Sequence, residues 1–78
     1  MDYDYREMGK LIRKLRKERG LSQDVLSGLA GIGRSHLAMI ENGSKIANVE
    51  TLYRIADALD MRMSDLFQMY ESKKQASL

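Results

Sequence analysis

The stretch QDVLSGLAGIGRSHLAMIENG, residues 23–43, decides the fold of this 78-residue chain. It predicts two short helices joined by a Gly-Ile-Gly turn that begins at Gly31. Ser27 is small enough for two helices to cross closely, and Gly31 permits the sharp change of direction that follows. Leu37 and Ile40 give the second helix an apolar face, because residues three positions apart lie on one side of a helix.

The other face of this second helix is polar or carries flexible side chains, and it consists of Arg34, Ser35, His36, Met39 and Asn42. Two short helices with one free polar face are typical of a helix-turn-helix, whose second helix enters the major groove of DNA. The sequence therefore predicts double-stranded DNA as the partner of this face.

Apolar residues recur at helical spacing along most of the chain and predict an all-α fold. We expect Leu29 and Val49 to be among the residues that make apolar contacts, with partial exposure as the alternative for Val25 and Leu29. Ser22, Asn48 and Ser64 are the predicted N-caps of the second, fourth and fifth helices. The predicted helices cover residues 5–19, 23–30, 34–42, 49–59 and 65–70, and form a domain over 5–70 with a fraying polar tail over 71–78.

The composition excludes several classes of protein. There is no cysteine, so disulfides and thiolate metal sites are ruled out, and the single histidine, His36, has no recognised zinc spacing. We expect neither metal nor cofactor. No apolar run approaches a membrane span, and the acidic start of the chain lacks the order of a signal peptide. These features favour a cytoplasmic protein that does not bind membranes.

Basic residues are concentrated near the start of the chain, although the net charge is only +2. A block of this kind attracts polyanions when it lies beside a helix-turn-helix, whereas in isolation it is more often a solvated helix face. The block contains Arg6, Lys10, Arg13, Lys14, Arg16, Lys17 and Arg19.

A series of motifs, in order, resembles one known family. They are Met8-Gly9-x-x-Ile12-Arg13-x-Leu15-Arg16, Gly20-Leu21-Ser22-Gln23, Ala30-Gly31-Ile32, Arg34-Ser35-His36-Leu37, Ile40-Glu41-Asn42-Gly43, Glu50-Thr51-Leu52 and Leu66-Phe67. The chain resembles Cro/C1-type (XRE-type) helix-turn-helix proteins, which include phage repressors and the controller proteins of restriction–modification systems. The resemblance implies a compact five-helix, repressor-like domain that regulates transcription. It also implies a homodimer that binds an inverted-repeat operator and represses transcription.

Four residues are candidates for reading bases: Arg34, Ser35, His36 and Met39. The planar fork of Arg34 can donate two hydrogen bonds to one guanine, and serine can bond to several base edges. Met39 can touch a thymine methyl group. The alternatives are a phosphate contact for Arg34, a surface role for His36 and a core-filling role for Met39.

A second set of residues is predicted to contact phosphates: Ser22, Gln23, Asn42, Ser44 and Lys45. The resemblance implies that Gln23 anchors a phosphate, and the start of its helix favours anions as well. Asn42 has the alternative role of capping its own helix. The resemblance further implies an ion pair between Arg16 and Glu41 that joins the first helix to the end of the third.

The candidates for a dimer interface are Met63, Met69 and Tyr70. The alternative is that the C-terminal apolar group, which also contains Leu66 and Phe67, packs against the first helix and completes the core. A competing function is a protein-interaction module, such as an antitoxin-like partner whose DNA binding is secondary. Neither an enzyme nor a protein with a small-molecule effector is expected, because no catalytic constellation or second domain is evident.

Overall fold

The structure is a computed structural model that describes residues 2–76, with the side chains of residues 2–73. Its described part contains five helices and no strand, so the prediction of an all-α five-helix fold is confirmed. The helices are α1 (Tyr5–Glu18), α2 (Gln23–Ala30), α3 (Arg34–Glu41), α4 (Val49–Ala58) and α5 (Met63–Ala76). None of the helices in this part is both long and apolar enough to cross a membrane.

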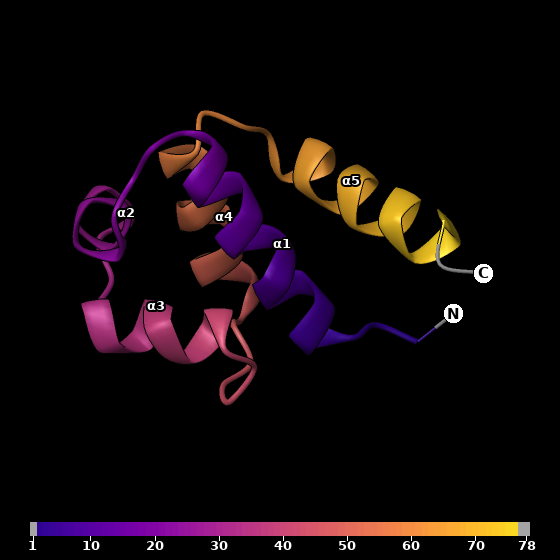
Figure 1. The fold of residues 1–78 in the computed structure, drawn as a ribbon, viewed down its shortest axis with the longest axis horizontal. Coiled ribbons are helices and arrows are strands. Elements are labelled where there is room, and N and C mark those ends of the chain that lie inside the picture. Colours follow the sequence, from indigo (N-terminus) through magenta and orange to yellow (C-terminus); the bar gives the residue numbers. More distant parts are fainter. Residues whose placement is uncertain (1, 77–78) are drawn as a thin grey trace.

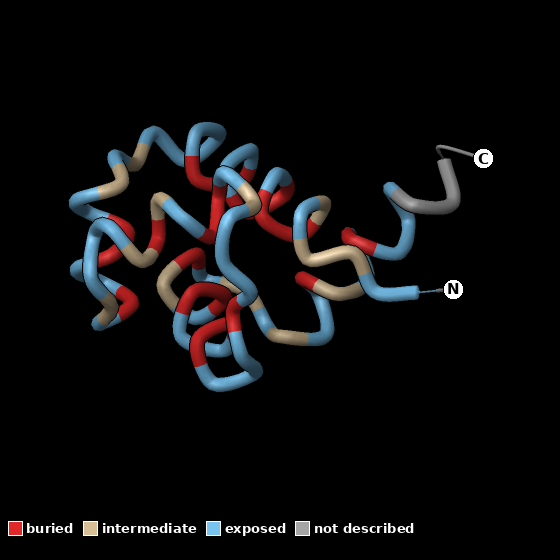
Figure 2. The backbone as a smooth tube through the Cα atoms, turned by 90° about the horizontal axis from the view of Figure 1, so that it is seen from below, coloured by how far each residue is buried: buried red, intermediate tan, exposed pale blue. Residues whose placement is uncertain are grey.

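The helices enclose one apolar core. α2 packs on α4, α1 packs on α3, and α5 closes the other side against α1 and α4. Figure 1 shows α2 and α3 at one end of the molecule and α5 at the opposite end, where the chain also begins. The buried positions line the inner sides of the helices (Figure 2). The largest fully buried side chains are Met8, Ile12, Leu15, Leu26, Leu37, Ile40, Ile55, Leu59 and Leu66.

Capping side chains mark the starts of three helices. Ser22 and Asn48 cap α2 and α4 as predicted, each accepting a hydrogen bond from a first-turn backbone N–H. Asp4, which the sequence reading missed, caps α1 by accepting from the N–H groups of Arg6 and Glu7 at 2.9 and 3.4 Å. The spacing of Asp4 and Glu7 is that of a capping box, which was the available signal.

Gly9 allows α1 to lie directly against α3. A Cβ atom at this position would stand 2.1 Å from the carbonyl oxygen of Ile40, which is backbone and cannot swing aside. The absence of a side chain at Gly9 therefore sets how closely the first helix approaches the end of α3.

Two residues at predicted apolar contact positions are exposed. Leu29 is 62% exposed, which agrees with the alternative given for it, whereas Val49 is 64% exposed and its expected core contact is wrong. Each lies four positions from another exposed apolar residue, Val25 and Tyr53 respectively, which places both pairs on outward helix faces. The inward faces of α2 and α4 are already filled by other apolar residues.

The last helix differs from the prediction at both ends. It begins at Met63 rather than after Ser64, so Ser64 lies in the first turn and is not the cap. Instead, Asp65 Oδ2 accepts from the N–H of Arg62 at 3.2 Å. The helix also continues to Ala76, six residues beyond the predicted end at Tyr70. The predicted fraying of this segment stays a prediction, and residues 77–78 lie outside the described part.

Candidate nucleic-acid interface

The turn between α2 and α3 is fixed by backbone hydrogen bonds. Gly31 adopts a left-handed conformation with φ of 71°, which glycine reaches without strain. Its N–H donates to the carbonyl of Gly28 at 3.2 Å, and the N–H of Ile32 donates to that of Ser27 at 3.0 Å. Ser27 is buried, as the predicted close crossing requires. The start of α3 is therefore held in a defined place next to α2.

α3 divides into a buried face and an outward face. Leu37 is fully buried and Ile40 is 2% exposed, so these two residues attach the helix to the core. Arg34, Ser35 and Met39 are exposed, with Met39 at 41%. His36 is only half-buried, and it lies at the edge of the outward face. Three of the four candidate base-reading side chains are thus accessible to a large ligand.

Arg34 forms an ion pair that the sequence reading did not anticipate. Its Nε lies 3.2 Å from Oδ1 of Asp24, the second residue of α2. Both side chains are largely exposed, at 67% for Arg34 and 75% for Asp24. No local sequence pattern pairs these two residues, because their approach depends on the angle between α2 and α3.

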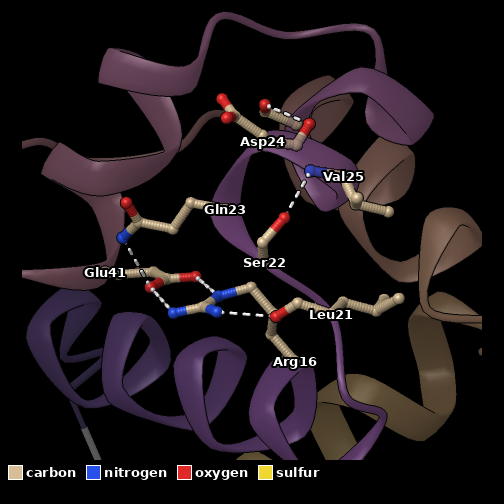
Figure 3. Close-up of polar contacts among 8 residues, drawn as sticks. Arg16, Leu21, Ser22, Gln23, Asp24, Val25 and Glu41 are labelled. Carbon is tan, nitrogen blue, oxygen red and sulfur yellow. Dashed lines mark hydrogen bonds and ion pairs between the residues drawn. The ribbon is translucent and has the colours of Figure 1, made fainter.

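A buried polar cluster joins α1, α2 and α3. Arg16 and Glu41, which were expected to pair, meet through Nε and Oε2 at 2.7 Å and through Nη2 and Oε1 at 2.9 Å. Arg16 Nη1 also donates to the carbonyl of Leu21 at 2.8 Å. Figure 3 shows this cluster, with the carboxylate of Asp24 pointing away from it. The hydrogen bond to Glu41 raises the pKa of the Arg16 guanidinium, against an opposing effect of burial.

Gln23 belongs to the same cluster. Its Nε2 donates to Oε1 of Glu41 at 3.1 Å, so its side chain is held at the start of α2 (Figure 3). Ser22 is exposed and its hydroxyl oxygen accepts from the N–H of Val25 at 3.1 Å. The two residues at the start of α2 are therefore placed by intramolecular contacts before any ligand binds.

The loop after α3 gathers the remaining phosphate candidates. Asn42 Oδ1 accepts from the N–H of Ser44 at 2.9 Å and also from its hydroxyl group at 2.5 Å. Lys45 is exposed beside them. The side chain of Arg6 lies against Gly43, since a Cβ there would be 3.3 Å from Cγ of Arg6. The structure thus brings one residue of the basic block to this loop, although it is far away in the sequence.

Other residues of the basic block have structural roles. Arg16 is buried against Glu41, and Arg19 Nε donates to the carbonyl of Leu59 at 3.0 Å. Lys10 pairs with Glu7 at 3.6 Å. The block is therefore not a uniform polyanion-binding face, and only part of its charge is available to a ligand.

The C-terminal candidates divide into surface and core. Met69 is 41% exposed and Met63 is half-buried, so both present apolar atoms to solvent. Tyr70 is only 4% exposed, and its hydroxyl oxygen accepts from the N–H of Asp4 at 2.7 Å. The expectation that Tyr70 offers surface to a partner is therefore wrong. Its ring packs in the core and beside Tyr3, whose own pKa is raised, mainly by burial.

No group of three or more His, Asp or Glu residues within the described residues is arranged to hold a metal ion. The geometry is instead that of a two-helix unit with one exposed, mainly polar face on α3. Residues 12–66 match the family model described as Helix-turn-helix. The chain belongs to the helix-turn-helix family. The match includes α2, α3 and α4, together with the second half of α1 and the start of α5, and the family is of the Cro/C1 type that the motifs indicated.

Two curated helix-turn-helix relatives are control proteins. The ImmF control region 10 kDa protein of Bacillus phage phi105 is 35% identical over 63 residues, which are 81% of this chain and 70% of that protein. Control protein C.MunI of a Mycoplasma species is 32% identical over 66 residues, which are 83% of this chain and 89% of that protein. The chain is accordingly a member of a family of DNA-binding transcriptional regulators.

Solved helix-turn-helix structures have the same fold. The restriction–modification controller protein C.AhdI from Aeromonas hydrophila is 33% identical with a TM-score of 0.78, over 81% of this chain and 96% of that chain. The controller protein C.Esp1396I was solved as a tetramer with its 35 base-pair operator. It is 22% identical with a TM-score of 0.84, over 92% of this chain and 95% of that chain, and at this identity the similarity supports the fold alone.

Proposed function

We propose that this helix-turn-helix protein represses transcription by binding an inverted-repeat operator as a homodimer, with α3 in the major groove of each half-site. The observation that carries the proposal is the division of α3. Leu37 and Ile40 anchor the helix, whereas Arg34, Ser35 and Met39 face outward from it. A helix that is held in place by one face can present its other face to base edges, and it then loses little conformational entropy on binding.

Phosphate contacts on both sides of α3 would set its depth in the groove. On one side, Gln23 and the first N–H groups of α2 offer donors, and the helix start favours negative charge. On the other side, Arg6, Ser44 and Lys45 lie close to one another around the end of α3. Asn42 orders this loop through its bonds to Ser44, and we assign it that role as well as a contact with phosphate.

The homodimer would form through the α5 side of the molecule. This end lies opposite α2 and α3, so pairing there leaves both reading faces uncovered (Figure 1). Met69 and Met63 supply the exposed apolar atoms, and buried Tyr70 supports the helix from behind. A two-fold axis uses the same patch from both subunits and matches the symmetry of an inverted repeat.

In this role the protein acts by binding alone and needs neither catalysis nor a cofactor. Two of its relatives come from a Bacillus phage and a Mycoplasma species, and bacterial DNA lies in the cytoplasm. We therefore place the protein in the cytoplasm. The bound homodimer would repress transcription by occupying the promoter.

The experiment is selection of bound duplexes from a random pool, followed by footprinting and binding titrations at several salt concentrations. Affinity for the selected duplex should fall linearly with salt on logarithmic axes, with a slope of about 0.9 per phosphate neutralised. Arg34→Ala should lower affinity for the selected site by roughly 1–3 kcal/mol and relax the preference at one base position per half-site. Gln23→Ala should weaken all sequences about equally.

Failure to bind any duplex at low salt would refute the proposed function. An unchanged selected motif with Arg34→Ala would leave DNA binding in place but remove Arg34 from base readout. A motif without two-fold symmetry would refute the homodimer on an inverted repeat.

A further inference from the structure

An exposed ion pair links the starts of the two helices of the helix-turn-helix. Oδ1 of Asp24 lies 3.2 Å from Nε of Arg34, and the two side chains remain 75% and 67% exposed. Asp24 follows the N-cap of α2 by two residues and Arg34 is the first residue of α3. The carboxylate is directed away from the buried cluster of Arg16 and Glu41 (Figure 3), so it is not part of that cluster.

The contribution of this pair to stability is small. Exposed ion pairs add little to the free energy of unfolding, because water screens both charges. The buried Arg16–Glu41 pair already fixes the helix packing at 2.7 Å. The main effect of Asp24 is therefore to orient the Arg34 guanidinium and to reduce its effective charge.

The geometry of the contact suits a role in recognition. The shortest contact between Asp24 and Arg34 is at Nε, and among the described residues neither Nη group of Arg34 forms a hydrogen bond with this carboxylate. Those two groups form the end of the planar fork, and a fork of this kind can donate two hydrogen bonds to O6 and N7 of one guanine. A guanidinium already held at Nε loses less side-chain freedom when it binds the base.

We propose that Asp24 is a positioning residue that determines specificity: it orients Arg34 toward one base edge and withholds its charge from phosphates. This inference rests on the proposed function, since it assumes that α3 reads DNA. On a non-cognate duplex, an unpaired arginine would turn to the nearest phosphate and add sequence-independent affinity. Pairing with Asp24 suppresses that contact, so the carboxylate increases the ratio of cognate to non-cognate binding.

The test compares Asp24→Asn, Arg34→Ala and the double variant with the unmodified full chain. Each protein is titrated, at several salt concentrations, with the duplex selected from the random pool and with a scrambled duplex of the same length. Glu18→Gln is the matched control, because it removes one exposed carboxylate at the end of α1, away from α3. Circular dichroism verifies that each variant remains helical, and Asp24→Ala is included to remove the oxygen acceptor as well as the charge.

Asp24→Asn should lower the ratio of cognate to scrambled affinity by about 2- to 10-fold per half-site, the value of one immobilised flexible side chain. The salt dependence of scrambled binding should steepen by about 0.9 per subunit, because Arg34 becomes available to a phosphate. Asp24→Ala should lower the ratio at least as far. In the Arg34→Ala background, Asp24→Asn should change neither quantity, since Asp24 acts through Arg34.

An unchanged ratio and slope with Asp24→Asn would overturn the inference while the proposed function stands. An equal rise in affinity for both duplexes, with and without Arg34, would also overturn it, because Asp24 would then act only by repelling phosphates. If the unmodified chain binds no duplex, the proposed function fails first and this inference fails with it.

Discussion

Replacement of Glu41 by leucine tests whether the Arg16–Glu41 pair holds α1 to the end of α3. The two side chains are 9% and 2% exposed, and they meet through two contacts of 2.7 and 2.9 Å. Glu41→Leu leaves a buried guanidinium with the Leu21 carbonyl as its remaining acceptor. Loss of one partner from a buried ion pair lowers the free energy of unfolding by about 3–5 kcal/mol. Because the Leu21 carbonyl still accepts a hydrogen bond from Arg16, we expect a loss near the lower end of this range.

The size of this loss is large for a chain of this length. A domain of 78 residues has a free energy of unfolding of about 4–12 kcal/mol, so a loss of about 3 kcal/mol removes a quarter or more of it. The midpoint of thermal unfolding should fall by about 12–24 °C, since 1 kcal/mol corresponds to about 4–8 °C in domains of this size.

The assay is urea unfolding followed by far-UV circular dichroism, for both single variants and the double variant Arg16→Met/Glu41→Leu. The double variant should be more stable than Glu41→Leu alone, because it replaces a buried ion pair with apolar side chains of similar volume. The coupling energy should be about 2 kcal/mol. Glu50→Ala is the control, since Glu50 is 77% exposed and lies 3.9 Å from Arg54; its loss should stay below about 1 kcal/mol.

Additive losses in this cycle would contradict the reasoning, because they would mean that the two side chains do not stabilise each other. A loss with Glu41→Leu no larger than that with Glu50→Ala would contradict it as well.

Three further changes test the packing, the backbone and the interface. Gly9→Ala should lower the free energy of unfolding by about 1–3 kcal/mol or more, because the new Cβ meets the Ile40 carbonyl. Gly28→Ala should raise the free energy of unfolding by about 0.5–1 kcal/mol, because its new Cβ meets nothing within 4 Å. Urea unfolding measures both changes. Asp60 has φ of 59°, so Asp60→Gly should raise the urea midpoint by relieving strain of about 1 kcal/mol, and a lower midpoint would contradict this. Met69→Glu should shift the protein toward monomer in sedimentation and weaken operator binding while the helical content stays the same.

The helices and their caps were largely predictable because they depend on neighbours in the sequence. Ser22 and Asn48 cap α2 and α4 as expected, and the Gly31 turn adopts the left-handed backbone that its residue type favours. The cap at Asp4 was missed, although the spacing of Asp4 and Glu7 was a local signal for it. The misplaced start of α5 was an error of two residues at a helix end, where local preferences are weakest.

The exposure of individual apolar residues was less predictable. Leu29, Val49 and Tyr70 all lie on helices with helical apolar spacing, yet the first two are exposed and the third is buried. Spacing tells which residues share a face, but the packing of other helices decides whether a particular turn is covered. Tyr70 is covered by the N-terminal segment, whose Asp4 N–H donates to its hydroxyl across 66 positions of sequence.

By itself, the sequence determined that this chain forms five helices, that the second and third make a helix-turn-helix, and that one face of α3 remains polar. Periodicity, capping and turn residues are short-range properties, and they suffice for these conclusions. Only the tertiary structure decided the partners of the charged side chains. It placed Arg34 beside Asp24, Gln23 on Glu41 and Arg6 against Gly43. Those contacts follow from the angles at which separate helices pack, and the order of residues along one helix does not contain that information.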